Sequence, residues 1–197
     1  MTFSVREVEE DRAVLSISST PATLVSYPRP FRLSVEYKVE GNSLLLNMVV
    51  ENTGDKEMSY GIGIHPGFIA PDENALFSIL PIGKEMSFLD KNGKPMERKE
   101  YTGKPLPLSF FQDNITLIVP EAKSITMDSA ERSIKLDMIS WPNLVVWRNE
   151  NDPFICLETW GNLPAKEGEE ENFNTRSNIR HLEGNGCAQF SLRFSFS

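Results

Sequence analysis

The sequence predicts an all-β fold, an antiparallel β-sandwich. Apolar residues recur with a period of two along many segments, which is typical of strands with one buried face. Thirteen prolines and twelve glycines are spread through the 197 residues and divide these segments into short pieces. No stretch of a dozen residues carries the stripe of an amphipathic helix. We therefore expect one β-rich domain over residues 1–197.

The clearest strands form a hairpin over residues 31–51. Residues 31–39 alternate apolar with polar side chains, Glu40-Gly41-Asn42 is a tight turn, and residues 43–51 return as the second arm. Asp90-Lys91-Asn92-Gly93-Lys94 has the composition of another hairpin turn. Further strands are predicted over residues 58–65, 75–81, 86–89, 115–119, 123–128, 133–139, 144–148, 154–158 and 186–196.

Charge and composition exclude several classes of function. The net charge of −8 argues against a nucleic-acid groove or an anionic membrane surface, because both need clustered Lys and Arg. No apolar run reaches transmembrane length, and the first residues lack a signal-peptide core, so we expect a cytoplasmic protein. The two cysteines form no zinc-binding spacing, and Cys156 lies in an apolar run as a buried thiol. We expect no metal and no cofactor.

One of the two histidines, His65, stands in an unusual setting. Glycines at positions 61, 63 and 67 let the backbone pass close to another group. Pro66 fixes its own φ and favours an extended conformation at His65. A strand that ends in a histidine held by a turn commonly aims that side chain into a cleft. A hydrogen-bonded structural histidine is the alternative.

Glu158 is the best candidate partner for this histidine. It follows the apolar residues 154–157 and precedes Trp160 and Gly161. A carboxylate at the end of an apolar strand is partly desolvated, which raises its pKa and suits it to act as a base. Trp160 has a flat face that stacks on a sugar ring. A salt bridge from Glu158 to an arginine, and simple packing by Trp160, are the alternatives.

Taken together and in order, five segments resemble the aldose 1-epimerases, or galactose mutarotases, and among them the LacX-like branch. The Gly-Ile-His-Pro-Gly-Phe run at 63–68 is similar to the family's Gly-x-His-Pro-x-Phe motif. The run at 154–161 is similar to its apolar-Cys-x-Glu-Pro-Trp strand. The other three matching segments are residues 27–31, 50–56 and 178–182.

The resemblance implies a galactose mutarotase-like supersandwich with a cleft for a hexose and without a metal. It implies that His65 is the general acid and Glu158 the general base. The base takes the proton of the anomeric hydroxyl while the acid protonates the ring oxygen, and closure with reversed roles gives the other anomer. We expect the two side chains on opposite sides of the hemiacetal.

Three further residues are candidates for sugar binding. Trp160 and Phe68 belong to the two motifs, and Asp113 is similar in place to a family aspartate that binds sugar hydroxyls. An Asx-turn before the strand at Ile115 is the alternative for Asp113. No cluster of basic residues lies near the motifs, which favours a sugar without phosphate.

The chain also departs from the family pattern. Gly67 stands where many members carry a larger residue, which removes a sugar contact or widens the cleft. Thr159 replaces the usual proline after the glutamate. Family members are longer at the N-terminus, where they carry a sugar-binding arginine and a second histidine, so the resemblance implies an N-terminally shortened supersandwich. Exposed sheet edges would then favour a homo-oligomer.

Three functions remain open from the sequence. The first is an isomerase of the aldose 1-epimerase type, which is the function we favour. The second is a non-catalytic carbohydrate-binding β-sandwich, and the third is an interaction domain without a ligand. Retention of both His65 and Glu158 favours the enzyme, because a pure binder has less need of an acid and a base on separate strands.

Overall fold

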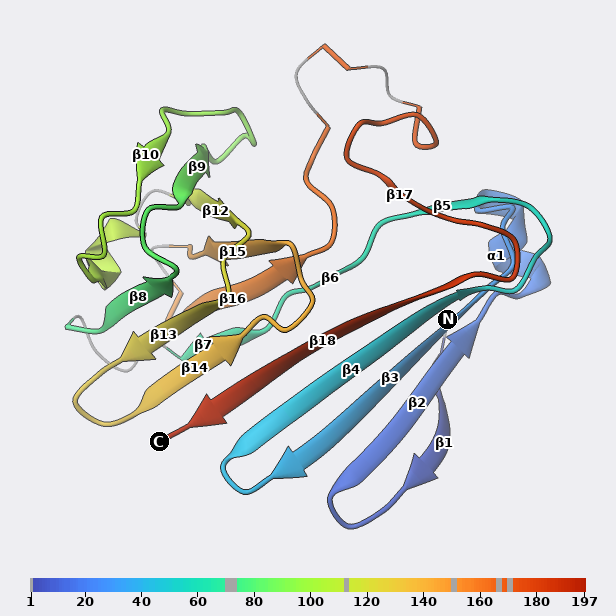
Figure 1. Ribbon diagram of the computed structural model, residues 1–197, viewed down its shortest axis with the longest axis horizontal. Coiled ribbons are helices and arrows are strands. Elements are labelled where there is room, and N and C mark those ends of the chain that lie inside the picture. Colours follow the sequence, from blue (N-terminus) through green and yellow to red (C-terminus); the bar gives the residue numbers. More distant parts are fainter. Residues whose placement is uncertain (1, 70–73, 112–113, 150–151, 166–167, 170–171) are drawn as a thin grey trace. The chain divides into compact units, whose positions relative to one another are not determined.

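A computed structural model describes residues 2–69, 74–111, 114–149, 152–165, 168–169 and 172–197 (Figure 1). The chain divides into two compact units. The first consists of Met1–Gly61 and Asn162–Leu192, and the second of Ile62–Gly161 and Arg193–Ser197. The prediction of one domain over residues 1–197 stays a prediction. None of the helices in the described part of the chain is long and apolar enough to cross a membrane.

The first unit contains five neighbouring strands of a nine-stranded sheet, in the order β1-β2-β3-β4-β18, in which β1 to β4 form an antiparallel meander. Its strands are β1 (Ser4–Val8), β2 (Arg12–Ser18), β3 (Phe31–Glu40), β4 (Ser43–Asn52) and the beginning of β18 (Cys187–Phe196). A separate pair joins β5 (Met58–Tyr60) to β17 (Arg180–Leu182). The predicted hairpin is confirmed, and Gly41 adopts the positive φ of 58° that its tight turn requires.

One short helix, α1 (Pro21–Ser26), links β2 to β3 in the first unit. The Thr20 side chain caps its first turn by accepting a hydrogen bond from the Thr23 N–H, and proline occupies the first helical position. Six residues are too few to produce a helical stripe, so the sequence pattern could not reveal this helix.

The second unit is an antiparallel β-sandwich of two sheets. One layer consists of the remaining strands of the nine-stranded sheet, in the order β18-β14-β13-β8-β11. The other is a seven-stranded sheet with the order β10-β9-β12-β15-β16-β6, in which β7 also pairs with β16. The first contains β8 (Leu76–Leu80), β11 (Leu106–Pro107), β13 (Ser124–Asp128), β14 (Ser133–Asp137) and the end of β18. The second contains β6 (Gly63–Ile64), β7 (Gly67–Ile69), β9 (Glu85–Leu89), β10 (Lys99–Glu100), β12 (Thr116–Pro120), β15 (Asn143–Trp147) and β16 (Phe154–Trp160).

The core of this sandwich consists of alternate residues from both sheets. Phe68 of β7 packs against Phe194 of β18, with ring centroids 5.2 Å apart. The short 3₁₀ helix η1 (Leu108–Phe110) is followed by Phe111, whose ring packs against Phe77. Fully buried apolar side chains make up the interior: Phe77, Ile79, Ile125, Met127, Leu136, Leu117, Val119, Leu144, Val146, Ile155 and Leu157.

The all-β prediction is confirmed, and so are the predicted strands from residue 31 onward, with one correction. Residues 58–65 were expected as one strand but form two, β5 in the first unit and β6 in the second. The strands before Phe31 gave no sequence signal, because all five residues of β1 are exposed and share no buried face. Pairing of this edge strand with another chain stays a prediction.

Candidate functional site

The strand β16 organises the site, because β6 and β7 pair with its two halves in one continuous register. On one side of the gap between β6 and β7, Ile64 lies opposite Thr159. On the other side, Gly67 lies opposite Cys156. His65 and Pro66 therefore lie opposite Glu158 and Leu157 in the same register, without a bulge.

Pro66 explains why the strand is interrupted at this point. Proline has no N–H to give to the ladder. Its carbonyl still accepts a hydrogen bond from the Leu157 N–H, at 3.2 Å. The register consequently places His65 directly across from Glu158, where cross-strand side chains on one face of a sheet come into contact.

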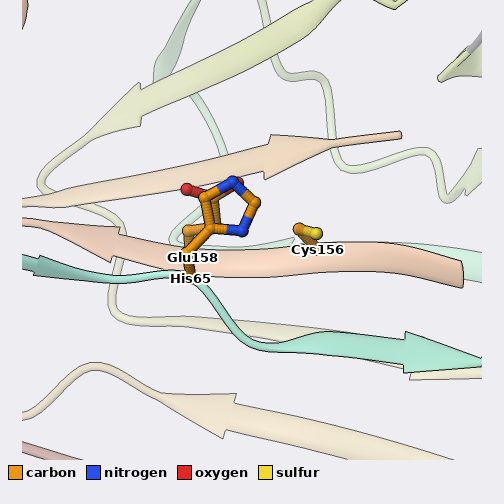
Figure 2. Close-up of side chains that lie close together, drawn as sticks. All are labelled: His65, Cys156 and Glu158. Carbon is orange, nitrogen blue, oxygen red and sulfur yellow. The ribbon is translucent and has the colours of Figure 1, made fainter. Parts of the chain in front are cut away.

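His65 and Glu158 meet on one face of this sheet, on the same side of β16 as Cys156 (Figure 2). The distance from His65 Nε2 to Glu158 Oε1 is 3.2 Å. The His65 side chain is 58% exposed, whereas the Glu158 side chain is 1% exposed. A buried carboxylate thus faces an imidazole that reaches solvent.

The two oxygens of Glu158 have different surroundings. Trp160 Nε1–H donates a hydrogen bond of 2.7 Å to Oε2, because residues 158 and 160 project from the same face of β16. Oε1 has no hydrogen-bond partner among the described residues, since His65 lies at ion-pair distance but outside hydrogen-bonding geometry. Burial raises the pKa of the Glu158 carboxyl, against the opposing effects of the Trp160 donor and of His65.

Cys156 extends this group along β16. It lies two residues before Glu158 and so projects from the same face. It is buried and forms no disulfide. Burial, together with the nearby charges of Glu158 and Asp152, raises the pKa of its thiol to about 11. At neutral pH the thiol is therefore protonated and a poor nucleophile.

A cavity of about 500 Å³ adjoins the pair. Its volume falls within the range of small-molecule sites, and its lining is mostly apolar. Gly67 lies close to the Phe154 ring, so that a Cβ at this position would lie 3.2 Å from Phe154 Cδ2. The lining residues are His65, Gly67, Ile69, Trp147, Phe154 and Cys156.

The predicted site residues are distributed as follows. His65, Glu158 and Trp160 come together, although Trp160 contacts the carboxylate rather than lining the cavity. Phe68 lies on the opposite face of its sheet, against Phe194 in the sandwich core. Asp113 lies outside the described residues. The roles of all five stay predictions.

The acid and the base lie side by side in direct contact. The reason is the register, which makes them a cross-strand pair. Their expected placement on opposite sides of a hemiacetal stays a prediction. Sequence reasoning missed Cys156 and Trp147 as site residues. The spacing of two from Glu158 could have revealed Cys156, whereas Trp147 depends on the pairing of β15 with β16, which local sequence does not encode.

Within the described residues, the same face also offers ligands for a metal ion. His65, Cys156 and Glu158 each supply one ligand atom, and these three atoms lie within 4.8 Å of one another. Sequence spacing relates only Cys156 to Glu158 on β16, because His65 joins them through the pairing of distant segments.

These features define an antiparallel β-sandwich with a histidine–carboxylate pair beside a cavity for a small ligand. The chain belongs to the aldose 1-epimerase family, whose sequence model matches residues 1–176. Two LacX proteins of Lactococcus lactis subsp. lactis, one chromosomal and one plasmid-borne, are each 30% identical to it over 180 residues. These alignments cover 82% of this chain and 60% of each LacX protein, so the chain spans about three fifths of the length of these relatives.

Solved structures with the same fold include two from lactobacilli. A galactose mutarotase related enzyme from Lactobacillus acidophilus matches with a TM-score of 0.90 and 19% identity, over 100% of this chain and 71% of that one. A galactose mutarotase-like protein from Lactobacillus casei matches with a TM-score of 0.84 and 21% identity, over 99% of this chain and 73% of that one. These similarities show the galactose mutarotase-like fold.

Proposed function

We propose that this chain carries the acid–base pair of an aldose 1-epimerase-like isomerase that interconverts the α and β anomers of a hexose. His65 is the general acid and Glu158 the general base. The observation that carries the proposal is the 3.2 Å contact between an exposed imidazole and a buried carboxylate beside a cavity. Membership of the aldose 1-epimerase family supports it.

The chemistry suits two groups that lie side by side. The anomeric hydroxyl and the ring oxygen are bonded to the same carbon, so a base and an acid on one face of a sheet address both of them. Oε1 of Glu158, which lacks a hydrogen-bond partner, accepts the hydroxyl proton while His65 Nε2–H protonates the ring oxygen. The ring opens, the aldehyde turns, and closure with reversed roles forms the other anomer.

The raised pKa of Glu158 favours this role. Its burial disfavours the charged form, which makes the carboxylate a stronger base than an exposed one. Trp160 holds the other oxygen and so fixes the direction in which Oε1 points. We propose Trp160 as a positioning residue for Glu158. Stacking of the sugar on Trp160 and a hydrogen bond that Asp113 accepts from a sugar hydroxyl are further proposals, whereas Phe68 faces the sandwich core and is left out of the proposed site.

The hexose is proposed to be unphosphorylated, and the protein to belong to the LacX-like branch. Among the described residues, the lining of the cavity includes no Lys or Arg, the side chains that bind a sugar phosphate. Trp147 and Phe154 offer aromatic faces on which the C–H side of a sugar stacks.

A non-catalytic carbohydrate-binding function is the second candidate. One observation favours it: His65 and Glu158 contact each other, so that a ligand must separate them before either group reaches it. Such a protein would bind a sugar in the same cavity without turnover.

Anomer exchange distinguishes the two candidates. The purified chain should accelerate the mutarotation of glucose or galactose, measured by polarimetry or by NMR exchange spectroscopy with α-glucose 6-phosphate as comparison. Tryptophan fluorescence that responds to sugar, without any acceleration, would support the binding function instead. Absence of both signals with glucose, galactose and their 6-phosphates would overturn both candidate functions.

A further inference from the structure

We propose that His65, Cys156 and Glu158 form a binding site for a thiophilic divalent cation, with Zn²⁺ as the best match, and that this cation silences the acid–base pair. The silencing rests on the proposed function, whereas the binding does not. The site consists of an imidazole nitrogen, a thiol sulfur and a carboxylate oxygen (Figure 2). These are the three ligand types that zinc accepts in proteins.

The backbone holds the three ligands in one patch of the sheet. Cys156 and Glu158 alternate along β16, so they share a face, and His65 lies across from Glu158 on the adjoining line of chain. Ligands around a tetrahedral zinc lie roughly 3.2–3.8 Å apart, given metal–ligand bonds of about 2.0–2.3 Å. The His65–Glu158 distance of 3.2 Å already meets this spacing. The sulfur of Cys156 lies within 4.8 Å of the other two ligand atoms, so a small movement of its side chain brings it within bonding distance of the metal.

An independent observation points to a ligand at this place. Oε1 of Glu158 is buried and has no hydrogen-bond partner among the described residues, although a buried carboxylate oxygen normally has one. It lies 3.2 Å from His65 Nε2, one of the other two ligand atoms. A cation supplies the missing partner, and the Trp160 hydrogen bond to Oε2 orients the carboxylate as second-sphere bonds orient metal ligands.

The cavity gives a cation access to this site. His65 and Cys156 both contribute to its lining, and Gly67, opposite Cys156, places no side chain over the thiol. Three protein ligands leave the fourth zinc position open toward the cavity for water. The thiol selects against Mg²⁺ and Ca²⁺, which prefer oxygen ligands alone.

Binding involves no oxidation or reduction. The S–H bond of Cys156 breaks, its proton goes to the buffer, and the sulfur bonds to Zn²⁺ as a thiolate. A proton on Glu158 Oε1 also leaves to the buffer, and the proton of His65 Nε2 moves to the buffer while Nδ1 keeps the N–H of the neutral ring. Glu158 binds through Oε1 and His65 through Nε2. Both atoms are then occupied by the metal, so neither can carry a proton to or from a sugar.

The chain provides its own matched controls. Cys187 is the other cysteine, free and exposed. His181 is the other histidine, and its Nδ1 lies 3.2 Å from Glu57 Oε1 on the surface. Substitution of either control residue leaves the proposed site intact, whereas loss of Cys156 or His65 removes a ligand.

The test is calorimetric titration of Zn²⁺ into the chelator-treated chain, with Co²⁺ absorption as a second reading of thiolate coordination. We expect one zinc per chain with a dissociation constant of about a micromolar or tighter. Cys156→Ser and His65→Gln should each weaken binding at least about 10-fold. Cys187→Ser and His181→Gln should leave it within about 3-fold. His65 is exposed, so its variant tests the site even where the core substitution at Cys156 disturbs folding.

Zinc binding that survives both site substitutions, or that is lost with either control substitution, would overturn the site. So would the absence of stoichiometric binding in the wild-type chain, or a Co²⁺ complex without a thiolate charge-transfer band. For the silencing, zinc should abolish anomer exchange and EDTA should restore it. A chain that binds zinc but never accelerates exchange would refute the proposed function and leave the metal site standing.

Discussion

The molecule contains two histidine–glutamate pairs with the same separation and different surroundings. His65 Nε2 lies 3.2 Å from Glu158 Oε1 in the second unit, and His181 Nδ1 lies 3.2 Å from Glu57 Oε1 in the first. The Glu158 side chain is 1% exposed, whereas that of Glu57 is 54% exposed. The distances agree, so the two pairs differ in the burial of the carboxylate and in the residues around each pair.

The residues around the two pairs also differ, and the surroundings of Glu158 are again the less polar ones. Glu158 has a tryptophan donor on one oxygen, none on the other, and a cavity nearby. His181 has Ser59 Oγ at 3.2 Å and stands at the surface, where an ion pair contributes little. A contact distance alone therefore does not identify a reactive site, because desolvation decides whether the carboxylate is a strong base.

The largest expected effect follows from removing the two carboxylates separately. Glu158→Gln keeps the size and the Trp160 hydrogen bond but removes the base, so the rate of anomer exchange should fall at least about 10²-fold. Glu57→Gln should change it less than about 2-fold. NMR exchange spectroscopy with EDTA in the buffer measures both, and equal losses in the two variants would refute the distinction.

The two histidines give a similar comparison. His65→Ala should lower the exchange rate about 10²-fold, because the ring oxygen loses its proton donor. His181→Ala should leave the rate within about 2-fold, since its partner is an exposed carboxylate. The measurement is polarimetry with matched protein concentrations. An active His65→Ala variant would show that another group protonates the ring oxygen.

Removal of the tryptophan donor should have a smaller effect. Trp160→Phe deletes the 2.7 Å hydrogen bond to Glu158 Oε2, and with it a contribution that lowers the pKa of that carboxyl. We expect an approximately 10-fold slower exchange, the order of a lost hydrogen bond to a charged group. In the Glu158→Gln background the same change should have little further effect. Additive losses would mean that Trp160 acts independently of Glu158.

The smallest predicted effect is on stability. The folded pKa of Glu158 is raised, so its neutral form is favoured and the stability it provides is lost as pH rises from the unfolded value through the folded one. At pH 8 the free energy of unfolding of Glu158→Gln should therefore be about 1 kcal/mol higher than that of the wild type. This difference should vanish near pH 4. Denaturant titration at both pH values measures it, with Glu57→Gln as control. An unchanged difference between pH 4 and pH 8 would argue against a desolvated carboxylate.

Much of this site could be predicted from the local sequence. The proline after His65 and the apolar run before Glu158 predicted a held histidine and a desolvated carboxylate, because these effects act within a few residues. The pairing of His65 with Glu158 could not be predicted from the sequence, since strand register depends on distant segments. For the same reason the contact of Phe68 with Phe194 and the proximity of Cys156 to His65 were visible only in the fold.

The first unit was harder to predict for a different physical reason. In β1 every residue is exposed, and α1 is held by a local cap rather than by a buried stripe. Neither leaves the periodic pattern by which strands and helices are recognised. The β3–β4 hairpin, with one buried face and a glycine turn, was evident from its alternation.

The central claim is that burial makes Glu158 a base, and its titration tests this most directly. The chain is labelled with ¹³C at glutamate carboxyl groups, freed of metal, and followed by NMR against pH, with the Glu158 signal assigned by its absence from Glu158→Gln. The account predicts that this carboxyl titrates above the ordinary glutamate value of about 4.3. A Glu158 carboxyl that titrates at or below that value would contradict it.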